Sequence, residues 1–260
     1  MSEAAAADDE VGVEVGPDHV AVVEIRRPPN NFFDVALIRR LADALDDLAA
    51  AGDATRAVVL CSAGRHFCAG ADFGGGGGGT GDSARLYEQA VRLFRQPLPV
   101  VAAVQGAAIG GGLGLALAAD LRVAAPEARF AANFARLGFH QGFGLSVTLP
   151  RAVGHQAALE LLTTGRRIGG EEAHRLGLAD RLVPAADLRD AARALAAEMA
   201  ASAPLAVRSI RATLRAGLAD EVAAATAHER AEQERLMRTA DFREGVAAVA
   251  ERRPGRFTGA

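Results

Sequence analysis

A glycine-rich turn between two apolar runs constrains this sequence more than any other stretch. Residues 100–104 are apolar and follow Pro99, which is typical of a buried strand. Four glycines then lie between Gly106 and Gly112, and residues 113–119 are rich in Ala and Leu, which predicts a buried helix. The first amides of a helix lack intrahelical acceptors, and the helix dipole favours negative charge there. We therefore expect this turn to hold an anion or a developing oxyanion.

Other glycine-loop chemistries need residues that this turn lacks. The dinucleotide pattern G-x-G-x-x-G fails from Gly110, because its sixth residue is Leu115. A phosphate-binding P-loop needs a lysine, and the sequence contains none. A nucleophile elbow, G-x-S-x-G, fails around Ser146, because Thr148 stands at its last position. On this motif alone, an oxyanion-binding turn and a turn that only lets a helix pack closely both remain open.

A second apolar run ends in a second turn of small residues. Residues 57–61 are typical of a strand, and the segment Arg65-His-Phe-Cys-Ala-Gly-Ala-Asp72 follows. Glycine and alanine leave backbone amides accessible in such a turn. Two turns of this kind can each direct one amide to a single oxygen, as an oxyanion hole requires.

These two motifs resemble the signatures of the enoyl-CoA hydratase/isomerase (crotonase) superfamily. The resemblance covers nearly the whole chain, from residues 20–29 through Leu162-Thr-Thr-Gly165 to Arg256-Phe-Thr-Gly259. It implies an α/β fold, a crotonase-like spiral of repeated ββα units with a C-terminal helical trimerisation module. The expected organisation is a disordered tail at 1–10, a spiral core with the CoA and acyl sites at 11–195, and a helical oligomerisation module at 196–260. The ordered motifs are specific for the superfamily and much less so for a reaction.

The resemblance also implies the site. The backbone amides of Ala71 and Gly111 would form the oxyanion hole for the thioester oxygen of an acyl-CoA. The helix predicted at 83–95 would wall the acyl pocket with Tyr87 and Glu88, for which ordinary surface positions are the alternative. Coenzyme A, as part of the substrate and with no further cofactor, would contact four residues: Arg26, Arg27, Ala69 and Phe257. A solvated arginine pair is the alternative reading of the first two.

Both carboxylates that hydration needs are absent. Hydratases use two carboxylates to position water and move protons, and the family positions for them align with Gly114 and Phe134 here. A third position, acidic in some dienoyl-CoA isomerases and in aryl-CoA dehalogenases, aligns with Gly142. Standard hydration is therefore not expected. The same absence argues equally against an isomerase activity that depends on the second glutamate. His140 is the remaining candidate for proton transfer near neutral pH, with a structural or surface role as its alternative.

Two functions stay open at this point. The first is an acyl-CoA enzyme with lyase, isomerase or hydrolase chemistry; decarboxylation fits well, because loss of carbon dioxide generates an enolate without a base. The second is a non-catalytic acyl-CoA-binding or assembly subunit. Retention of both oxyanion turns favours the enzyme, whereas loss of both carboxylates favours the binder.

Composition excludes several other classes of protein. The 260 residues carry a net charge of −3, which gives no reason to expect nucleic acid as a partner. No apolar run reaches the roughly 20 residues of a membrane span. The two cysteines, Cys61 and Cys68, predict no disulfide framework and fit a reducing cytoplasm. His66 with Cys68 is too little for a metal site. The family resemblance implies a homotrimer or a dimer of trimers.

Overall fold

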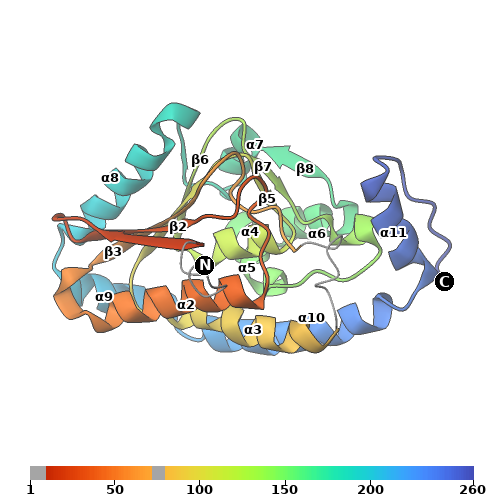
Figure 1. Cartoon of the computed structure of the whole chain (residues 1–260), viewed down its shortest axis with the longest axis horizontal. Helices are drawn as coiled ribbons and strands as arrows, with labels where there is room; N and C mark the ends of the chain where they lie inside the picture. Colours follow the sequence, from red (N-terminus) through yellow and green to blue (C-terminus); the bar gives the residue numbers. More distant parts are fainter. Residues whose placement is uncertain (1–9, 72–79) are drawn as a thin grey trace, which may run out of the picture.

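The computed structural model describes residues 10–71 and 80–260. Except for Glu10, the predicted N-terminal tail lies outside the described residues. Two sheets form the framework (Figure 1). In this part of the chain the larger sheet has six strands in the order β1 (Val11–Val15), β2 (Val20–Ile25), β3 (Ala57–Ser62), β4 (Val100–Val104), β6 (Leu121–Ala124) and β9 (Arg181–Leu182). The smaller sheet has the order β5 (Ala107–Ile109), β7 (Arg129–Ala131) and β8 (Arg167–Gly169).

Strand pairing follows the chain connections. β1 and β2 form the predicted antiparallel hairpin, whereas β2, β3, β4, β6 and β9 run parallel. In the smaller sheet β5 and β7 are parallel, and β8 is antiparallel to β7. Parallel strands need crossover connections, and these carry most of the helices. The helices before residue 187 are α2 (Val35–Ala50), α3 (Thr80–Arg95), α4 (Gly111–Ala118), α5 (Leu145–Val153), α6 (His155–Thr164) and α7 (Gly170–Arg175). Short 3₁₀ turns lie at η1 (Gly52–Ala54), η2 (Asn133–Leu137) and η3 (Ala185–Asp187).

Helix α2 forms as its sequence predicts. The side chain of Asp34 accepts a hydrogen bond from the Leu37 amide at 2.8 Å, which caps the first turn. Leu41, Leu45 and other apolar residues at helical spacing are buried against the sheet. The helix therefore covers one face of the sheet and begins beside the two glycine turns.

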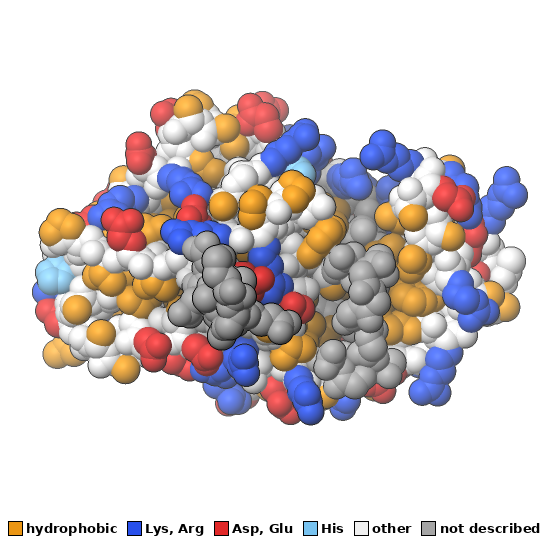
Figure 2. Space-filling model, in the orientation of Figure 1, with side chains coloured by type: hydrophobic (Ala, Val, Ile, Leu, Met, Phe, Trp, Pro, Cys, Tyr) orange, Lys and Arg blue, Asp and Glu red, His pale blue; other side chains and the backbone are white. Residues whose placement is uncertain are grey.

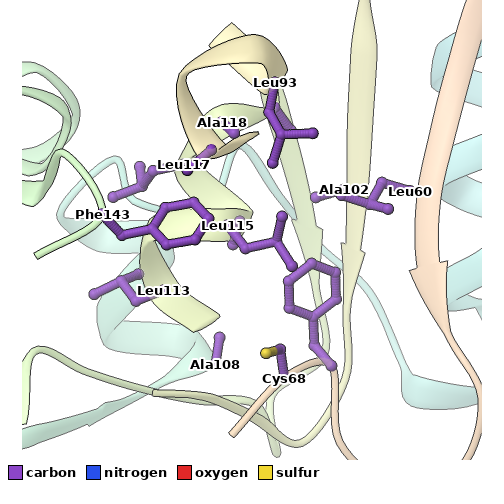
Figure 3. Close-up of a cluster of buried hydrophobic side chains, with 14 of the residues drawn as sticks. Leu60, Cys68, Leu93, Ala102, Ala108, Leu113, Leu115, Leu117, Ala118 and Phe143 are labelled. Carbon is purple, nitrogen blue, oxygen red and sulfur yellow. The ribbon is translucent and has the colours of Figure 1, made fainter. Parts of the chain in front are cut away.

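The larger sheet is buried on both faces. Val59 and Cys61 of β3 pack in a cluster with α8, whereas Val58 and Leu60 belong to the main core with α2 and α3. Continuous apolar strands are typical of such two-sided burial. Helix α4 lies inside the main core, and Figure 3 shows its residues Leu113 and Leu115 with Phe143 beside the helix.

The chain after residue 187 is helical, as predicted. Its helices are α8 (Leu188–Ala200), α9 (Pro204–Leu214), α10 (Leu218–Leu236) and α11 (Ala240–Ala250). α10 packs against α3 and α5, and α11 packs against η2. Figure 1 shows α2, α3 and α10 along one side of the molecule and α11 at the end that holds the C-terminus. Spiral packing of ββα units and trimerisation by these helices remain predictions.

In the described ranges, no helix combines the length and the apolar character that a bilayer crossing requires.

Candidate active site

A cavity of about 900 Å³ lies where the two glycine turns meet. Most of its lining side chains are apolar, and its size suits a small-molecule ligand. Helices α2, α3, α10 and α11 contribute to its walls. In Figure 2 hydrophobic side chains gather on the part of α11 that faces the body of the protein, and Val246 and Val249 of this helix line the cavity. The cavity is therefore lined by residues both within 11–195 and within 196–260.

The amide of Gly111 opens helix α4 at the cavity. Gly110 is the N-cap, with φ +57°, and its own amide donates to the Ala131 carbonyl at 2.8 Å. The amides of Leu113 and Gly114 both donate back to the Gly110 carbonyl, at 3.0 and 3.2 Å. Gly111, as the first helical residue, has no intrahelical acceptor for its N–H. The positive end of the helix dipole is therefore directed to the cavity that Gly111 lines.

Ala71 reaches the same cavity from the other turn. Phe33 donates its amide to the Gly70 carbonyl at 3.0 Å and forms a parallel bridge with Ala71. In that register the amide of Phe33 bonds to Gly70 and not to Ala71, so the N–H of Ala71 is not paired with Phe33. A methyl group on Gly70, where φ is +95°, would lie 2.8 Å from the Ile109 carbonyl oxygen and 3.9 Å from the Gly111 nitrogen. Only glycine at position 70 lets the two turns approach this closely.

The structure gives a packing reason for one missing carboxylate. A β-carbon on Gly114 would lie 2.6 Å from the β-carbon of Phe143, so no side chain fits there. Phe134 lines the cavity and packs against Phe139, with ring centroids 5.4 Å apart. A β-carbon on Gly142 would overlap the hydroxyl of Tyr87. All three positions are occupied or enclosed by aromatic groups.

Asp34 is the one carboxylate among the described lining residues. It caps α2 through the Leu37 amide and pairs with Arg27 at 3.0 Å. Burial by itself would raise the pKa of Asp34, but the hydrogen bonds from Leu37 and Arg27 outweigh it and hold that pKa below its ordinary value. Asp34 is thus engaged in helix capping and an ion pair, and these interactions make it a poor general base.

The predicted site residues separate into two groups. Ala69, Ala71 and Gly111 all line the cavity. His140 is not among its described lining residues; its Nδ1 lies 2.8 Å from the Gln141 carbonyl oxygen, and its ring packs near that of His228. The structure therefore does not bring the predicted proton-transfer group to the cavity.

The predicted CoA contacts at Arg26, Arg27 and Phe257 also lie outside the described lining. Arg26 pairs with Glu24 at 2.8 Å. Arg27 pairs with Glu10 at 2.6 Å and with Asp34. Two of the predicted cations are therefore already neutralised within the chain, and Phe257 is 46 % exposed.

Sequence analysis missed the cations that do line the cavity. Arg129 begins β7 and Arg167 begins β8, two paired strands in which Ala131 lies opposite Arg167. Both arginines are exposed, and the ion pairs of the described residues include neither. They are 38 residues apart in sequence, so only the strand pairing reveals them as neighbours.

His66 adds a neutral imidazole to the lining. Its Nδ1 accepts a hydrogen bond from the Ala107 amide at 3.2 Å, which places the proton of the neutral ring on Nε2. Burial, then the charges of Arg129 and Arg65, lower the pKa of His66. The ring is therefore neutral at pH 7 and offers one N–H donor.

This histidine makes stability fall as the pH falls. The unfolded chain takes up a proton near pH 6.5, before the folded His66 does, so the free energy of unfolding decreases below that pH. Replacing the ring by the neutral acceptor in H66Q is expected to flatten the change between pH 7.5 and 5.5. Urea unfolding of both proteins at the two pH values measures this. Equal pH dependence in the two proteins would contradict the assignment.

Two further polar side chains close one end of the cavity. Tyr87 of α3 lines it with only 8 % of its surface exposed and donates from its hydroxyl to Oε1 of Gln233 at 2.8 Å. Glu88, the other predicted wall residue, is exposed and lies outside the described lining. Gln233 was not predicted, because it lies in a charged stretch of α10 with nothing in its sequence context to set it apart.

Neither sequence nor structure gives a metal site. Among the described residues, no group of three or more His, Cys, Asp or Glu side chains is arranged to hold a metal ion. Cys61 and Cys68 are both buried free thiols, and burial raises the pKa of Cys61 to about 11 and that of Cys68 to about 12. These thiols are inert rather than nucleophilic.

Comparison with known proteins agrees with this geometry. The sequence model of the enoyl-CoA hydratase/isomerase family matches residues 16–260. A protein of Rhodobacter capsulatus named as a probable enoyl-CoA hydratase is 40 % identical over 246 residues, covering 92 % of this chain and 95 % of its own. The crystal structure of an enoyl-CoA hydratase/isomerase from Pseudoalteromonas atlantica superposes with a TM-score of 0.85 at 31 % identity, covering 96 % of this chain and 100 % of the other.

A second solved structure leads to the same family. The enoyl-CoA hydratase from Mycobacterium avium subsp. paratuberculosis gives a TM-score of 0.83 at 30 % identity and covers 96 % of this chain and 98 % of the other. These matches span nearly the full length of both partners, and they confirm the mixed α/β fold of the crotonase type. This chain is an enzyme that belongs to the enoyl-CoA hydratase/isomerase family.

Proposed function

We propose that the protein binds an acyl-CoA thioester with its carbonyl oxygen between the amides of Ala71 and Gly111, and that these amides stabilise the enolate. The observation that carries the proposal is the approach of the two glycine turns within one apolar cavity. Backbone donors held in place before reaction stabilise developing charge without reorganisation, and one such donor is worth roughly 3 kcal/mol. Coenzyme A is then part of the substrate, and no further cofactor is required.

We propose further that standard hydration is not the reaction. The support is the lack of room at Gly114, the aromatic side chain at Phe134, and the engagement of Asp34 in a cap and an ion pair. A hydratase needs two carboxylates free to position water and transfer protons. The described lining offers none, so the enolate must arise by a route that does not use this pair.

Arg129 and Arg167 are proposed to hold the anionic end of coenzyme A. They line the cavity without an ion pair of their own in the described part, whereas Arg26 and Arg27 are paired with acids. In Figure 2 basic and acidic side chains are interspersed over the face shown, and Arg129 and Arg167 are the two arginines among the described cavity-lining residues. Phosphate groups attract such exposed cations, and salt screens the attraction.

The double variant R129Q/R167Q is expected to bind a CoA thioester about ten-fold more weakly than the wild type at low salt. The difference should shrink at 0.5 M salt, because screening removes the attraction. Calorimetric titration with butyryl-CoA at both salt concentrations measures it. R26Q/R27Q serves as the comparison. An equal loss of affinity in that variant would contradict the proposal and assign the phosphate contact to Arg26 and Arg27.

The proposed chemistry is tested by α-proton exchange in deuterated water. Acyl-CoAs that bind are incubated with the enzyme, and mass spectrometry follows deuterium uptake at the α-carbon. We expect no hydration of crotonyl-CoA, and enzyme-dependent uptake would show that the enolate forms and that a proton-transfer group reaches the α-carbon. Rapid hydration would overturn the second part of the proposal. Binding with neither exchange nor any other reaction would favour the non-catalytic acyl-CoA binder.

We also propose a cytoplasmic homotrimer or dimer of trimers. The support is an exposed apolar face on α9, where Ile210 and Leu214 lie one turn apart and are 60 % and 81 % exposed. Several large exposed aliphatic side chains on one helix indicate an interaction surface more often than a single exposed side chain does. Light scattering coupled to size exclusion gives the mass directly, and a 26.8 kDa monomer would contradict the proposal.

A further inference from the structure

The polar pair of Tyr87 and Gln233 stands where other side chains of the cavity are apolar. A β-carbon on Gly142 would overlap the Tyr87 hydroxyl and lie 2.6 Å from Nε2 of Gln233. The pair thus occupies the space into which a side chain at position 142 would project. Phe143 follows directly, and one of its ring atoms lies 3.6 Å from a β-carbon built on Gly111. The pair is therefore close, along the cavity wall, to the amide that opens α4.

One donor of this pair has no acceptor assigned in the described part of the protein. The Tyr87 hydroxyl donates to Oε1 of Gln233 at 2.8 Å. Nε2 of Gln233 donates to the His140 carbonyl at 3.0 Å, and an amide nitrogen carries two hydrogens. Both residues line the cavity, so the second N–H of Gln233 is available to a ligand there. Its direction is fixed by the two bonds that the amide already makes.

The surroundings of the pair favour a neutral oxygen over an anion. Glu229 lies one helical turn before Gln233 on α10, fully buried, and accepts the amides of Gly144 and Ser146 at 2.8 and 3.0 Å. Its charge, after the larger effect of burial, raises the pKa of Tyr87, so the phenol stays protonated. The cationic lining residues belong to β7 and β8, whereas the pair lies between α3 and α10. A second carboxylate beside Glu229 would be desolvated and repelled.

We propose that Gln233, held by Tyr87, recognises a neutral carbonyl or hydroxyl oxygen on the acyl group, so that the substrate class is an oxygenated acyl thioester. This inference rests on the proposed function, because it assumes that the cavity binds a CoA thioester. An amide donor in a mostly apolar wall favours a ligand that supplies an acceptor, and an unsubstituted alkyl chain leaves that donor without a partner. Tyr87 acts as a positioning residue for the amide.

Calorimetric titration with four thioesters tests the inference. Butyryl-CoA has no oxygen on its chain, 3-hydroxybutyryl-CoA and 4-hydroxybutyryl-CoA carry a hydroxyl, and succinyl-CoA has a terminal carboxylate at the length of the 4-hydroxy compound. We expect the wild type to bind one of the hydroxylated thioesters about five-fold more tightly than butyryl-CoA. Succinyl-CoA should bind no better than butyryl-CoA.

The double variant Y87F/Q233L is expected to lose the preference, so that it binds the hydroxylated thioesters no more tightly than butyryl-CoA. Removing both partners avoids leaving a buried hydroxyl without an acceptor. M237L, at the C-cap of the same helix and lining the same cavity, is the matched control and should keep the preference. If the double variant does not fold, the comparison of the four thioesters in the wild type still tests the inference. Y87F alone then replaces the double variant, and we expect it to show a reduced preference.

The outcomes separate this inference from the proposed function. No binding of any thioester by the wild type overturns the proposed function and, with it, the inference. Butyryl-CoA bound as tightly as both hydroxylated thioesters overturns the inference alone. A preference that survives in Y87F/Q233L, or tightest binding of succinyl-CoA, also overturns it and leaves the proposed function standing.

Discussion

Gly112→Ala is expected to destabilise the protein by about 3 kcal/mol or more, at the upper end of overpacking effects. A β-carbon at position 112 would overlap the carbonyl oxygen of Cys68 and lie 2.8 Å from its carbonyl carbon. That carbonyl cannot move freely, because it accepts the Ile109 amide at 3.1 Å while the Cys68 amide donates to Ala107 at 2.9 Å. The β-carbon clashes with a backbone carbonyl, so no side-chain rotation relieves the overlap.

Urea unfolding measures this loss, and Gly169→Ala is the matched control. Gly169 has φ −82°, and a β-carbon there would have its nearest neighbour 3.9 Å away. Alanine therefore fits, and the control should stay within about 0.5 kcal/mol of the wild type. Similar unfolding midpoints for the two variants would show that the two glycine turns are not as closely packed as described.

Restoring the family's first carboxylate with Gly114→Glu is expected to cost at least about 3 kcal/mol and to give no hydration of crotonyl-CoA. The β-carbon alone would lie 2.6 Å from that of Phe143, and the site is buried inside the core. Figure 3 shows the Phe143 side chain directed at α4. A carboxylate at this position would also lose its hydration without gaining a described partner.

Phe143→Gly should make room for residue 114. Phe143 has φ +61°, a conformation that glycine adopts without strain, so part of the cost of losing a buried ring is offset. In a double-mutant cycle, Gly114→Ala with Phe143→Gly is expected to be less destabilising than the sum of the single variants by about 1.5 kcal/mol or more. The alanine variant isolates the steric part from the charge of glutamate. Additive effects would mean that Phe143 is not what excludes a side chain at 114.

The aromatic rings of Phe143 and Phe33 beside the cavity pack together and belong to the same steric arrangement. Phe143 packs against Phe33 at 5.4 Å between ring centroids, and ring atoms of Phe33 would in turn meet a β-carbon on Gly111 at 2.7 Å. The rings therefore hold the α4 amide in place while they exclude the side chains that a hydratase would need. The same packing explains the retention of the oxyanion turns and the loss of the carboxylate at 114.

The local elements were predictable because each depends on neighbouring residues. Asp34 caps α2 through Leu37, three residues later, and alternating or continuous apolar runs specify β2, β3 and β4. The glycine turn before α4 follows from its own composition. The family followed from the ordered motifs along the chain.

The content of the site was decided by residues that are distant in sequence. Arg27 looked available for a phosphate, but Glu10 and Asp34 pair with it, and the His140 ring makes its contacts outside the described cavity lining. Tyr87 meets Gln233 across 146 residues, a contact that no local pattern encodes.

Sequence by itself therefore determined the α/β class, the family and the two glycine turns, since these depend on residue type, periodicity and motif order. Tertiary structure decided which charges are already paired, which polar groups face the cavity and why position 114 admits no side chain. The physical reason is that ion pairing, burial and steric exclusion depend on which groups packing brings together. The separation of those groups along the sequence does not reveal these contacts.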